Sequence, residues 1–415
     1  MKKLLLLLLS LITLINVEAQ VSSIRLMSWN LLNWPVTSNA IADSTTRCPN
    51  YRAVVEYVNP DILVTQENAA TYSTTWFLNC AMNANGNAYR QGSYIHGYDT
   101  NNGIFYKDSL FQFLSNTRIQ TELRDINEFK LLFKETGDTL RIYSVHLKAS
   151  SGSLNEAARA AEVDSLRKVT NQLPYGSNFI VCGDFNIYET FESSFSKLLQ
   201  INSNDEGHFI DPINLQDTLW NKYIYRQYHT QSTHDLQSGG FVGGGLDDRF
   251  DMILFSEAVA QTTGVYYIAG STTPVGNDGN HYNKAINDGF NAAVPANIAN
   301  ALFGASDHLP IYAQFDIGPT SGIDDFNRDV ADVLVFPNPA SSSIYVEYTS
   351  RSSADITISL TDLSGKIIYV STIKNNRIGR TVQSIPEFAS LKSGVYFLSI
   401  RTNKSLINRK LIKVE

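Results

Sequence analysis

The distribution of apolar, strand-like runs is the feature of this sequence that most constrains its fold. These runs bunch in pairs, and helical segments fill only some of the gaps between them. Parallel strands need a long crossover in every gap, so the distribution favours antiparallel or mixed sheets over a doubly wound parallel sheet. The runs are residues 24–29, 61–65, 103–106, 129–133, 140–146, 179–182, 251–255, 264–268 and 311–317. The clearest helix is predicted over 153–173, opened by a capping box of Ser153 and Glu156.

The pattern changes after residue 317. Residues 318–331 begin with Gly, Pro, Ser and Asp, which is typical of a linker. Residues 332–415 then alternate apolar and polar residues between short turn signals, which predicts a small all-β sandwich domain. Charge changes too: residues 20–318 hold 19 Lys and Arg against 30 Asp and Glu, a net charge of −11, whereas residues 319–415 carry +3. A body this acidic must bind any polyanion through local groups or bound cations.

The first residues have the features of an export signal. Two lysines precede an apolar run over residues 4–15, and Ala19 ends a small-residue cleavage site. The run is shorter than the roughly 20 residues of a membrane-spanning helix. We therefore expect residues 1–19 to be a signal peptide, and the mature protein to be exported without a stable membrane span. In an oxidising compartment Cys48 and Cys80 could form a disulfide, which the sequence leaves open, whereas Cys182 lies in an apolar run and is expected to be buried.

Polar residues stand at the ends of six apolar runs. They comprise four carboxylates, two amides and two imidazoles, without Lys or Arg: Asn30, Glu67, His146, Asp184, Asn186, Asp251, Asp307 and His308. Each alone fits the ordinary role of a turn former or cap. As a set, their carboxylate and amide oxygens suit Mg²⁺, Mn²⁺ or Ca²⁺, and two histidines beside such an ion can move protons to and from a phosphate.

Six strings around these residues carry a family resemblance. In chain order they are SWNLLN, VTQEN, SVHLKAS, VCGDFNIYE, DDRFDMILFS and ASDHLP. Together they resemble the endonuclease/exonuclease/phosphatase superfamily, the fold of pancreatic-type deoxyribonuclease. The resemblance implies that residues 20–317 form a catalytic domain of the α/β class, a four-layer sandwich of two mixed β-sheets with outer helices. The active site would lie where strand ends of both sheets converge.

The resemblance also implies the roles of the metal-binding residues. Glu67 and Asp307 would be the main metal ligands, with Asn30 in support. Mg²⁺ or Mn²⁺ is the expected cofactor, and Ca²⁺ could serve as a structural ion.

Five residues are assigned to catalysis on the same grounds. His308, oriented by Asp251, would activate the attacking water, with Asp184 as the rival base. Asp184 and Asn186 would position water and phosphate oxygens. His146 would bind the phosphate or protonate the leaving oxygen.

Three features near the six strings keep more than one interpretation. The resemblance to the deoxyribonuclease branch implies that an upstream Glu pairs with His146. The string YDTNNGIFYK contains no Glu, so Asp99 is only a candidate substitute. Arg249 either contacts phosphate or forms a surface ion pair with Asp247 or Asp248. The string YHTQSTHDL is either a substrate-contacting loop or an ordinary polar loop, and its notable residues are His229, Gln231 and His234.

The C-terminal residues resemble a second family. The strings FPNPAS, TDLSGKIIY, LKSGVYFLSI and INRKLIKV are similar to the sorting domains that the type IX secretion pathway reads. The resemblance implies an outer-membrane secretion machinery as partner and a secreted or cell-surface protein. Whether the domain is cleaved stays open, and an ordinary carbohydrate-binding or adhesive β-sandwich is the alternative.

The sequence therefore predicts a secreted, divalent-metal-dependent phosphodiesterase. We expect a monomeric endonuclease of low specificity that hydrolyses DNA, with RNA as a further substrate. A lipid phosphodiesterase of sphingomyelinase type, or another phosphatase of this fold, is the alternative. A lipid enzyme should expose an apolar hairpin, for which residues 266–268 are the candidate, although a core strand is the favoured interpretation. An inactive surface adhesin should have lost one of the metal or histidine positions, and none is missing.

Overall fold

The computed structural model divides the chain into two compact units, Met1–Ser321 and Gly322–Glu415. The predicted signal peptide and residues 319–329 of the predicted linker lie outside the residues that the structure describes. The described residues are 22–35, 44–174, 176–201, 207–215, 219–260, 264–318, 330–350, 353–362, 365–374, 377–402 and 406–414.

The first unit contains a seven-stranded mixed sheet. Its strands in spatial order are β10 (Val265–Tyr267), β12 (Ile311–Ile317), β1 (Ser22–Trp34), β2 (Ile62–Asn68), β4 (Asn101–Lys107) and β3 (Tyr89–Gln91), with β11 (Thr273–Pro274) also paired to β12. The pair β1–β2 is parallel, and the other pairs are antiparallel.

The second sheet of this unit has five strands and the same mixed character. In spatial order they are β5 (Phe111–Ile119), β6 (Ile126–Phe133), β7 (Thr139–His146), β8 (Phe179–Asp184) and β9 (Asp251–Phe255). The pair β7–β8 is parallel, and the other three pairs are antiparallel.

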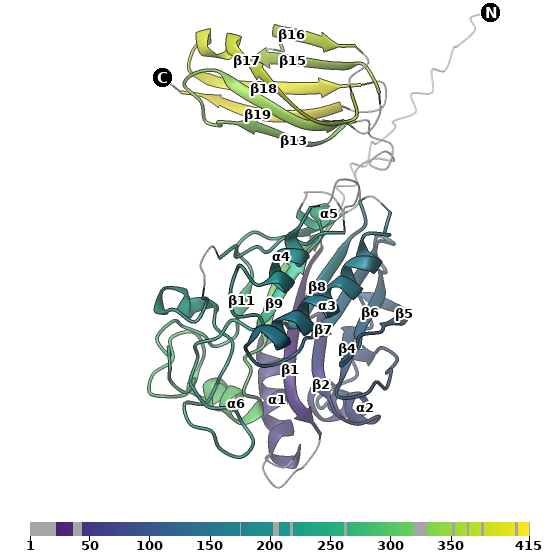
Figure 1. Ribbon diagram of the computed structural model, residues 1–415, viewed down its shortest axis with the longest axis vertical. Coiled ribbons are helices and arrows are strands. Elements are labelled where there is room, and N and C mark those ends of the chain that lie inside the picture. The colour runs from purple at the N-terminus through teal and green to yellow at the C-terminus, as the bar shows by residue number, and fades with distance from the viewer. Residues whose placement is uncertain are drawn as a thin grey trace, which may run out of the picture. The chain divides into compact units, whose positions relative to one another are not determined.

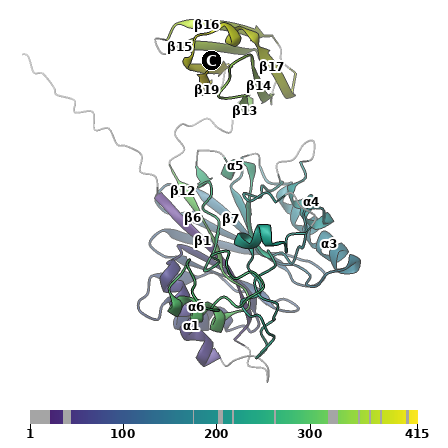
Figure 2. The ribbon, with the colours of Figure 1, turned by 90° about the vertical axis from the view of Figure 1, so that its left-hand side faces the viewer.

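The two sheets pack face to face between two layers of helices. Successive strand residues point to opposite faces, so Leu26 of β1 packs between the sheets whereas Met27 and Trp29 pack beneath the helices. Figure 2 shows α1 and α6 on one side of the strands and α3 and α4 on the other, and Figure 1 shows α3 and α4 lying across one sheet. The helices are α1 (Ser44–Val58), α2 (Ser73–Phe77), η1 (Leu78–Met82), α3 (Ser153–Thr170), α4 (Ser193–Leu199), η2 (Tyr223–Tyr228), α5 (Glu257–Ala260) and α6 (Ala296–Ala305). This four-layer architecture confirms the predicted fold class.

One detail of the predicted helix is wrong. No side-chain hydrogen bond caps α3, whose N-cap residue is Gly152 rather than Ser153. The amide of Glu156 instead donates to the carbonyl of Gly152 at 3.0 Å. Ser153 is already inside the first helical turn, so its hydroxyl cannot play the part of a cap.

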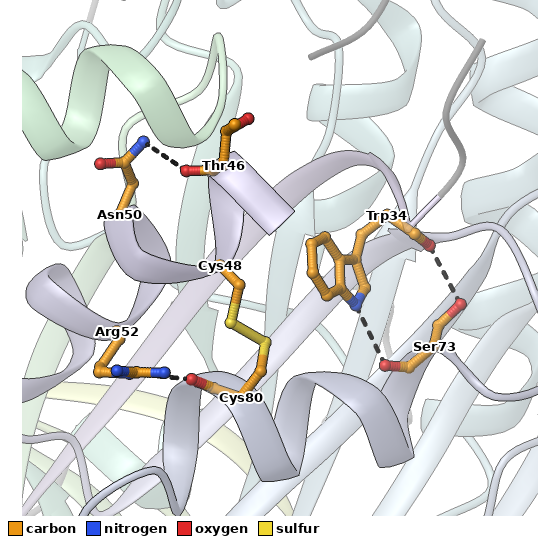
Figure 3. Close-up of a disulfide and its surroundings, with 7 residues drawn as sticks. All are labelled: Trp34, Thr46, Cys48, Asn50, Arg52, Ser73 and Cys80. Atoms are coloured by element: carbon orange, nitrogen blue, oxygen red, sulfur yellow. Dashed lines mark hydrogen bonds between the residues drawn. A yellow bond between two sulfur atoms is a disulfide. The ribbon is translucent and has the colours of Figure 1, made fainter. Parts of the chain in front are cut away.

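A disulfide between Cys48 and Cys80 joins α1 to η1 (Figure 3). The two cysteines are separated by 32 residues, and β2 lies between them in sequence. Arg52 Nε donates to the carbonyl of Cys80 at 3.0 Å and adds a second tie between the same two elements. Cys182 is buried, as its apolar run predicted.

The second unit is all-β, as predicted. Two antiparallel sheets, β13–β14–β17 and β16–β15–β18–β19, share one apolar core. Their bounds are β13 (Val330–Phe336), β14 (Ile344–Ser350), β15 (Ile356–Asp362), β16 (Ile367–Ile373), β17 (Gly379–Ile385), β18 (Gly394–Arg401) and β19 (Leu406–Lys413), with the short helix η4 (Pro386–Ser390) before β18.

Candidate active site

All eight residues at the strand ends meet at one edge of the sandwich. The parallel pairs β1–β2 and β7–β8 end at this edge, and their antiparallel neighbours β9 and β12 begin there. Strands β1 and β2 also contact β8 across the sandwich. Polar residues that are distant in sequence therefore come together: Asn30, Glu67, His146, Asp184, Asn186, Asp251, Asp307 and His308.

Asn30 connects the two sheets at this edge. Its Nδ2 donates to Glu67 Oε1 at 2.9 Å and to Asp184 Oδ2 at 3.1 Å. Its Oδ1 accepts a hydrogen bond from the amide of Leu32 at 2.9 Å, which fixes the orientation of the side chain. Asn30 therefore holds one carboxylate of each sheet at a set distance from the other.

Glu67 and Asp307 form the acidic end of the site. The amide of Asn33 donates to Glu67 Oε2 at 2.7 Å, and the amide of Val242 donates to Asp307 Oδ2 at 3.0 Å. Asp307 Oδ1 is buried, and no group of the described residues donates a hydrogen bond to it. Burial, and then the charge of Asp307, raise the pKa of Glu67, and burial raises the pKa of Asp307. Because burial disfavours the charged form of these two carboxylates, a cation bound to them would stabilise that form.

The donor set at this place fits a hard divalent ion. Within the described residues, no three His, Cys, Asp or Glu side chains gather into a ready-made metal cluster. Mg²⁺ does not need one, because it is usually held by one or two carboxylates and keeps several waters. Glu67 and Asp307 supply two such carboxylates.

His308 is held on both ring nitrogens. Its Nδ1 lies 2.8 Å from Asp251 Oδ2, and its Nε2 lies 2.7 Å from the amide nitrogen of Gln231 and 3.7 Å from Asp184 Oδ2. Burial alone would lower the pKa of the His308 ring, but the Asp251 and Asp184 carboxylates hold it well above its ordinary value. The ring is therefore positively charged near neutral pH. Since an imidazolium can only donate, the Gln231 amide must turn its oxygen toward Nε2 in that state.

His146 lies near the same oxygen of Asp184 as His308 does. Its Nε2 lies 3.5 Å from Asp184 Oδ2 and 3.7 Å from Glu67 Oε1, and its buried Nδ1 has no hydrogen-bond partner among the described residues. Asp99 does not pair with this ring: it binds Arg124 Nε at 2.9 Å, so the interpretation of Asp99 as the partner of His146 is wrong. Burial, followed by the charge of Arg124, lowers the pKa of His146 well below its ordinary value. This ring is therefore neutral at neutral pH.

The close packing of β8 on β7 sets the position of Asp184 and Asn186. A Cβ atom at Gly183, whose φ is +139°, would lie 2.0 Å from the carbonyl oxygen of Val145, so only glycine fits there. The tight approach is followed by a turn in which the amide of Asn186 donates to Asp184 Oδ1 at 3.1 Å. Burial raises the pKa of Asp184 to about 7. A carboxylate that titrates near neutral pH is suited to exchange protons.

The structure shows where Arg249 and the residues of the string YHTQSTHDL lie. Arg249 makes two hydrogen bonds to Asp211, at 2.9 and 2.7 Å, and both side chains are buried. Both earlier interpretations of Arg249, a phosphate contact and a surface ion pair, are therefore wrong. The ring nitrogens of His229 lie at backbone carbonyls, and His234 stacks between Phe241 and Phe303.

Gln231 is the member of that loop that reaches the site. Sequence reasoning singled out its string but could not assign it to His308, 77 residues away. The backbone of Gln231 forms a bridge with His308 and another with Asp248, which places its side chain beside the imidazole. The only sequence signal was its position in a polar string of the kind that often lines sites.

The comparison with family models shows to which family the chain belongs. The model described as the endonuclease/exonuclease/phosphatase family matches residues 27–308, more than half of the chain. The chain belongs to this family. Members of the endonuclease/exonuclease/phosphatase family are hydrolases of phosphoester bonds and generally use divalent metal ions. No curated protein matches the chain.

A second model, the secretion system C-terminal sorting domain, matches residues 334–414. This domain indicates export through type IX secretion to the cell surface or the extracellular space, and so implies the secretion machinery as a partner. Among the described residues, no helix has the length and apolarity needed to cross a membrane.

Several solved structures are similar to this chain at low identity. The human Nocturnin catalytic domain with bound sulfate anion is 18% identical, with a TM-score of 0.46, over 72% of this chain and 97% of that one. The D. rerio TDP2 structure complexed with single strand DNA product is 17% identical, with a TM-score of 0.47, over 71% and 99%. The endonuclease/exonuclease/phosphatase from Beutenbergia cavernae is 12% identical, with a TM-score of 0.42, over 94% and 100%.

Proposed function

We propose that this chain is an exported, divalent-metal-dependent phosphodiesterase that cleaves DNA, and RNA as a further substrate, with low sequence specificity. The observation that supports it most is the placement of two imidazoles around Asp184: Nε2 of His146 lies 3.5 Å and Nε2 of His308 lies 3.7 Å from its Oδ2. Hydrolysis of a phosphodiester needs a group that accepts a proton from water and donors that stabilise phosphate and leaving oxygens. This arrangement offers both within one desolvated site.

Glu67 and Asp307, supported by Asn30, would hold the metal ion. When bound, the ion would neutralise phosphate charge and stabilise the charge that develops in the transition state. The unpartnered Asp307 Oδ1 and the raised pKa values of both carboxylates support this assignment. Asn30 would keep Glu67 at a fixed distance from Asp184, so that the metal ion and the base keep a constant separation.

Asp184 would accept the proton of the attacking water, and His308 would stabilise the phosphate. An imidazolium paired with Asp251 has no free lone pair, so it acts as a hydrogen-bond donor rather than a base. Asp184, with a pKa raised to about 7 by burial, can take up a proton near neutral pH. This favours Asp184 over His308 as the base.

His146 would bind the phosphate or the leaving oxygen through its Nε2. Because burial keeps the ring neutral, Nε2–H donates a hydrogen bond there rather than a full proton. Asn186 would orient the Asp184 carboxylate through its backbone amide. Each imidazole should contribute about two to four orders of magnitude to turnover.

The lipid alternative lacks a membrane-binding hairpin at its candidate segment. Residues 266–268 are not a free hairpin: Tyr266 and Tyr267 pair with β12, and the Tyr267 ring stacks on Phe255 at 4.7 Å. The favoured interpretation of a strand is confirmed for this segment. The inactive-adhesin alternative finds no support either, because all eight site residues are present and lie together.

An activity assay on three substrate classes tests this proposal. Purified protein would be assayed with Mg²⁺ or Mn²⁺, and with excess chelator, against plasmid DNA, RNA and sphingomyelin vesicles. We expect cleavage of DNA with either ion, loss of activity with chelator, and none in a Glu67→Gln variant, which removes one metal ligand while nearly preserving shape. Hydrolysis of sphingomyelin vesicles without any cut in DNA would favour the lipid enzyme. Full activity in chelator would remove the metal from the mechanism.

A further inference from the structure

A groove of about 670 Å³ lies beside Lys148, in the loop that follows His146, and the proposed mechanism does not use it. Three segments line it: the turn after β5, at residues 120–123, Lys148 in the loop after β7, and the outward face of α3. We call this cavity the α3 groove. Its volume lies within the range of about 300–1,000 Å³ that small-molecule sites occupy.

The loop that contains Lys148 links the α3 groove to the catalytic site in sequence. Lys148 is the second residue after His146, and its amide donates to Glu162 Oε2 of α3 at 2.8 Å. Arg159 Nη1 donates to the carbonyls of Lys148 and Ser150 at 2.7 and 2.8 Å. These contacts clamp the loop that follows the catalytic imidazole onto α3. A group held in the groove therefore has a fixed position relative to His146.

The opposite wall is tied to the same catalytic residue. Leu123 lines the groove, and the next residue, Arg124, donates to the carbonyl of Leu147 at 3.4 Å. The charge of Arg124 is also one of the influences that lower the pKa of His146. Both walls are thus anchored to the segment that carries the imidazole.

The lining suits an uncharged, flat group with polar edges. Leu123, Leu154 and Ala158 supply an apolar surface, and Leu154 is 86% exposed. Gln120 and Asn155 supply amide groups at the margin, and Asn155 uses its Nδ2 on the carbonyl of Ser151, which leaves its Oδ1 to accept a hydrogen bond from a ligand.

The charges of the groove argue against a phosphate as its occupant. Lys148 is offset by Glu122 and Glu162, so the lining has no net positive charge. Burial raises the pKa of Glu162 to about 7, and its Oε1 is buried without a hydrogen-bond partner. A phosphate would meet an acidic wall, whereas a neutral sugar and base would meet apolar surface and amides.

We propose that the α3 groove binds the nucleoside that adjoins the scissile phosphate on the His146 side. This inference rests on the proposed nuclease function. It places the base against Leu154 and Ala158, where apolar contact is non-directional and does not depend on base identity. The groove would therefore increase affinity for a strand without selecting its sequence.

Filling the groove tests the proposal, and two adjacent alanines of α3 give a matched pair. Ala158 lines the groove, whereas Ala157, the exposed residue before it, does not. Steady-state kinetics on a short single-stranded oligonucleotide should show a KM about tenfold higher for Ala158→Phe with kcat unchanged, because the substitution removes binding that is equally strong in the ground state and the transition state. Ala157→Phe should match the wild type. Ala161→Phe, also in the groove, repeats the test should the first variant fold poorly.

The outcomes separate this inference from the proposed function. Oligonucleotide cleavage by the wild type with no change in KM for Ala158→Phe and Ala161→Phe would overturn the groove assignment alone. Absence of any cleavage of DNA or RNA by the wild type would overturn both. Sphingomyelin hydrolysis that only the groove variants lose would assign the groove to a lipid headgroup instead.

Discussion

Among single residues, His308 is the most constrained side chain of the site. Asp251 holds one ring nitrogen at 2.8 Å, and Gln231 approaches the other at 2.7 Å. If His308 binds the phosphate as we propose, Gln231 occupies the position that a phosphate oxygen would take, and the substrate would displace it. We regard Gln231 as a positioning residue that keeps the imidazole aimed at Asp184 before substrate binds.

Replacing either imidazole should lower turnover without unfolding the protein. We expect His308→Ala and His146→Ala each to reduce kcat by about two to four orders of magnitude, because each removes a donor to the reacting oxygens. His96→Ala is the control, since that histidine is exposed and remote in sequence from the site strings. Circular dichroism would verify the fold. A variant pair that keeps more than about a tenth of wild-type turnover would contradict the assigned roles.

At the scale of elements, most of what could be predicted came from the alternation of apolar and polar residues and from the polar residues at the ends of strands. Strands β9 and β12 begin and end where the sequence predicted, because their apolar runs are bounded by polar residues. Strand β5 was not predicted, since this edge strand carries many polar residues among its apolar ones. The partners of Arg249 and His308 could not be predicted either, because Asp211 and Gln231 lie in loops 38 and 77 residues away.

The link between α1 and η1 gives a prediction at this scale. The double variant Cys48→Ala/Cys80→Ala should lower the free energy of unfolding by about 2–4 kcal/mol, because the disulfide closes a loop of 32 residues in the unfolded chain. Urea denaturation under oxidising conditions would measure the difference. Reduction of the wild type should reproduce the midpoint of the double variant. If neither treatment moves the midpoint, the disulfide does not stabilise this unit.

At the scale of the whole molecule, the two compact units have separable tasks. The eight site residues belong to the first unit, and the match to the sorting domain belongs to the second. Each unit has an apolar core of its own. A protein built in this way should tolerate removal of one unit without loss of the other's fold.

Deletion of residues 332–415 should therefore leave an active catalytic unit that no longer crosses the outer membrane. We expect the truncated chain to remain soluble, to cleave DNA at the rate of the full chain, and to accumulate in the periplasm. Fractionation of cells followed by a nuclease assay would measure both properties. Deletion that makes the first unit insoluble would contradict the separation of the units, and normal appearance in the medium would contradict the sorting role.

The charge of the first unit determines how its activity should respond to salt. Residues 20–318 carry a net charge of −11, and several basic residues near the site strings already serve the protein. Arg47 binds backbone carbonyls, Lys107 pairs with Asp61, and Arg249 pairs with Asp211. Few cations are left for phosphates, so the salt dependence of oligonucleotide binding should correspond to about two or three phosphate contacts.

That dependence can be measured as the slope of log affinity against log salt for a short oligonucleotide. Dedicated DNA-binding proteins neutralise roughly six to ten phosphates and lose affinity steeply as salt rises. A slope of that size here would mean that a basic surface contacts the strand, and would contradict the metal-screened site. A shallow slope would agree with a few contacts to the DNA backbone that position the strand without reading its bases. Oligonucleotides of different sequence should then be cut at similar rates. A strong sequence preference would contradict the low specificity that we propose.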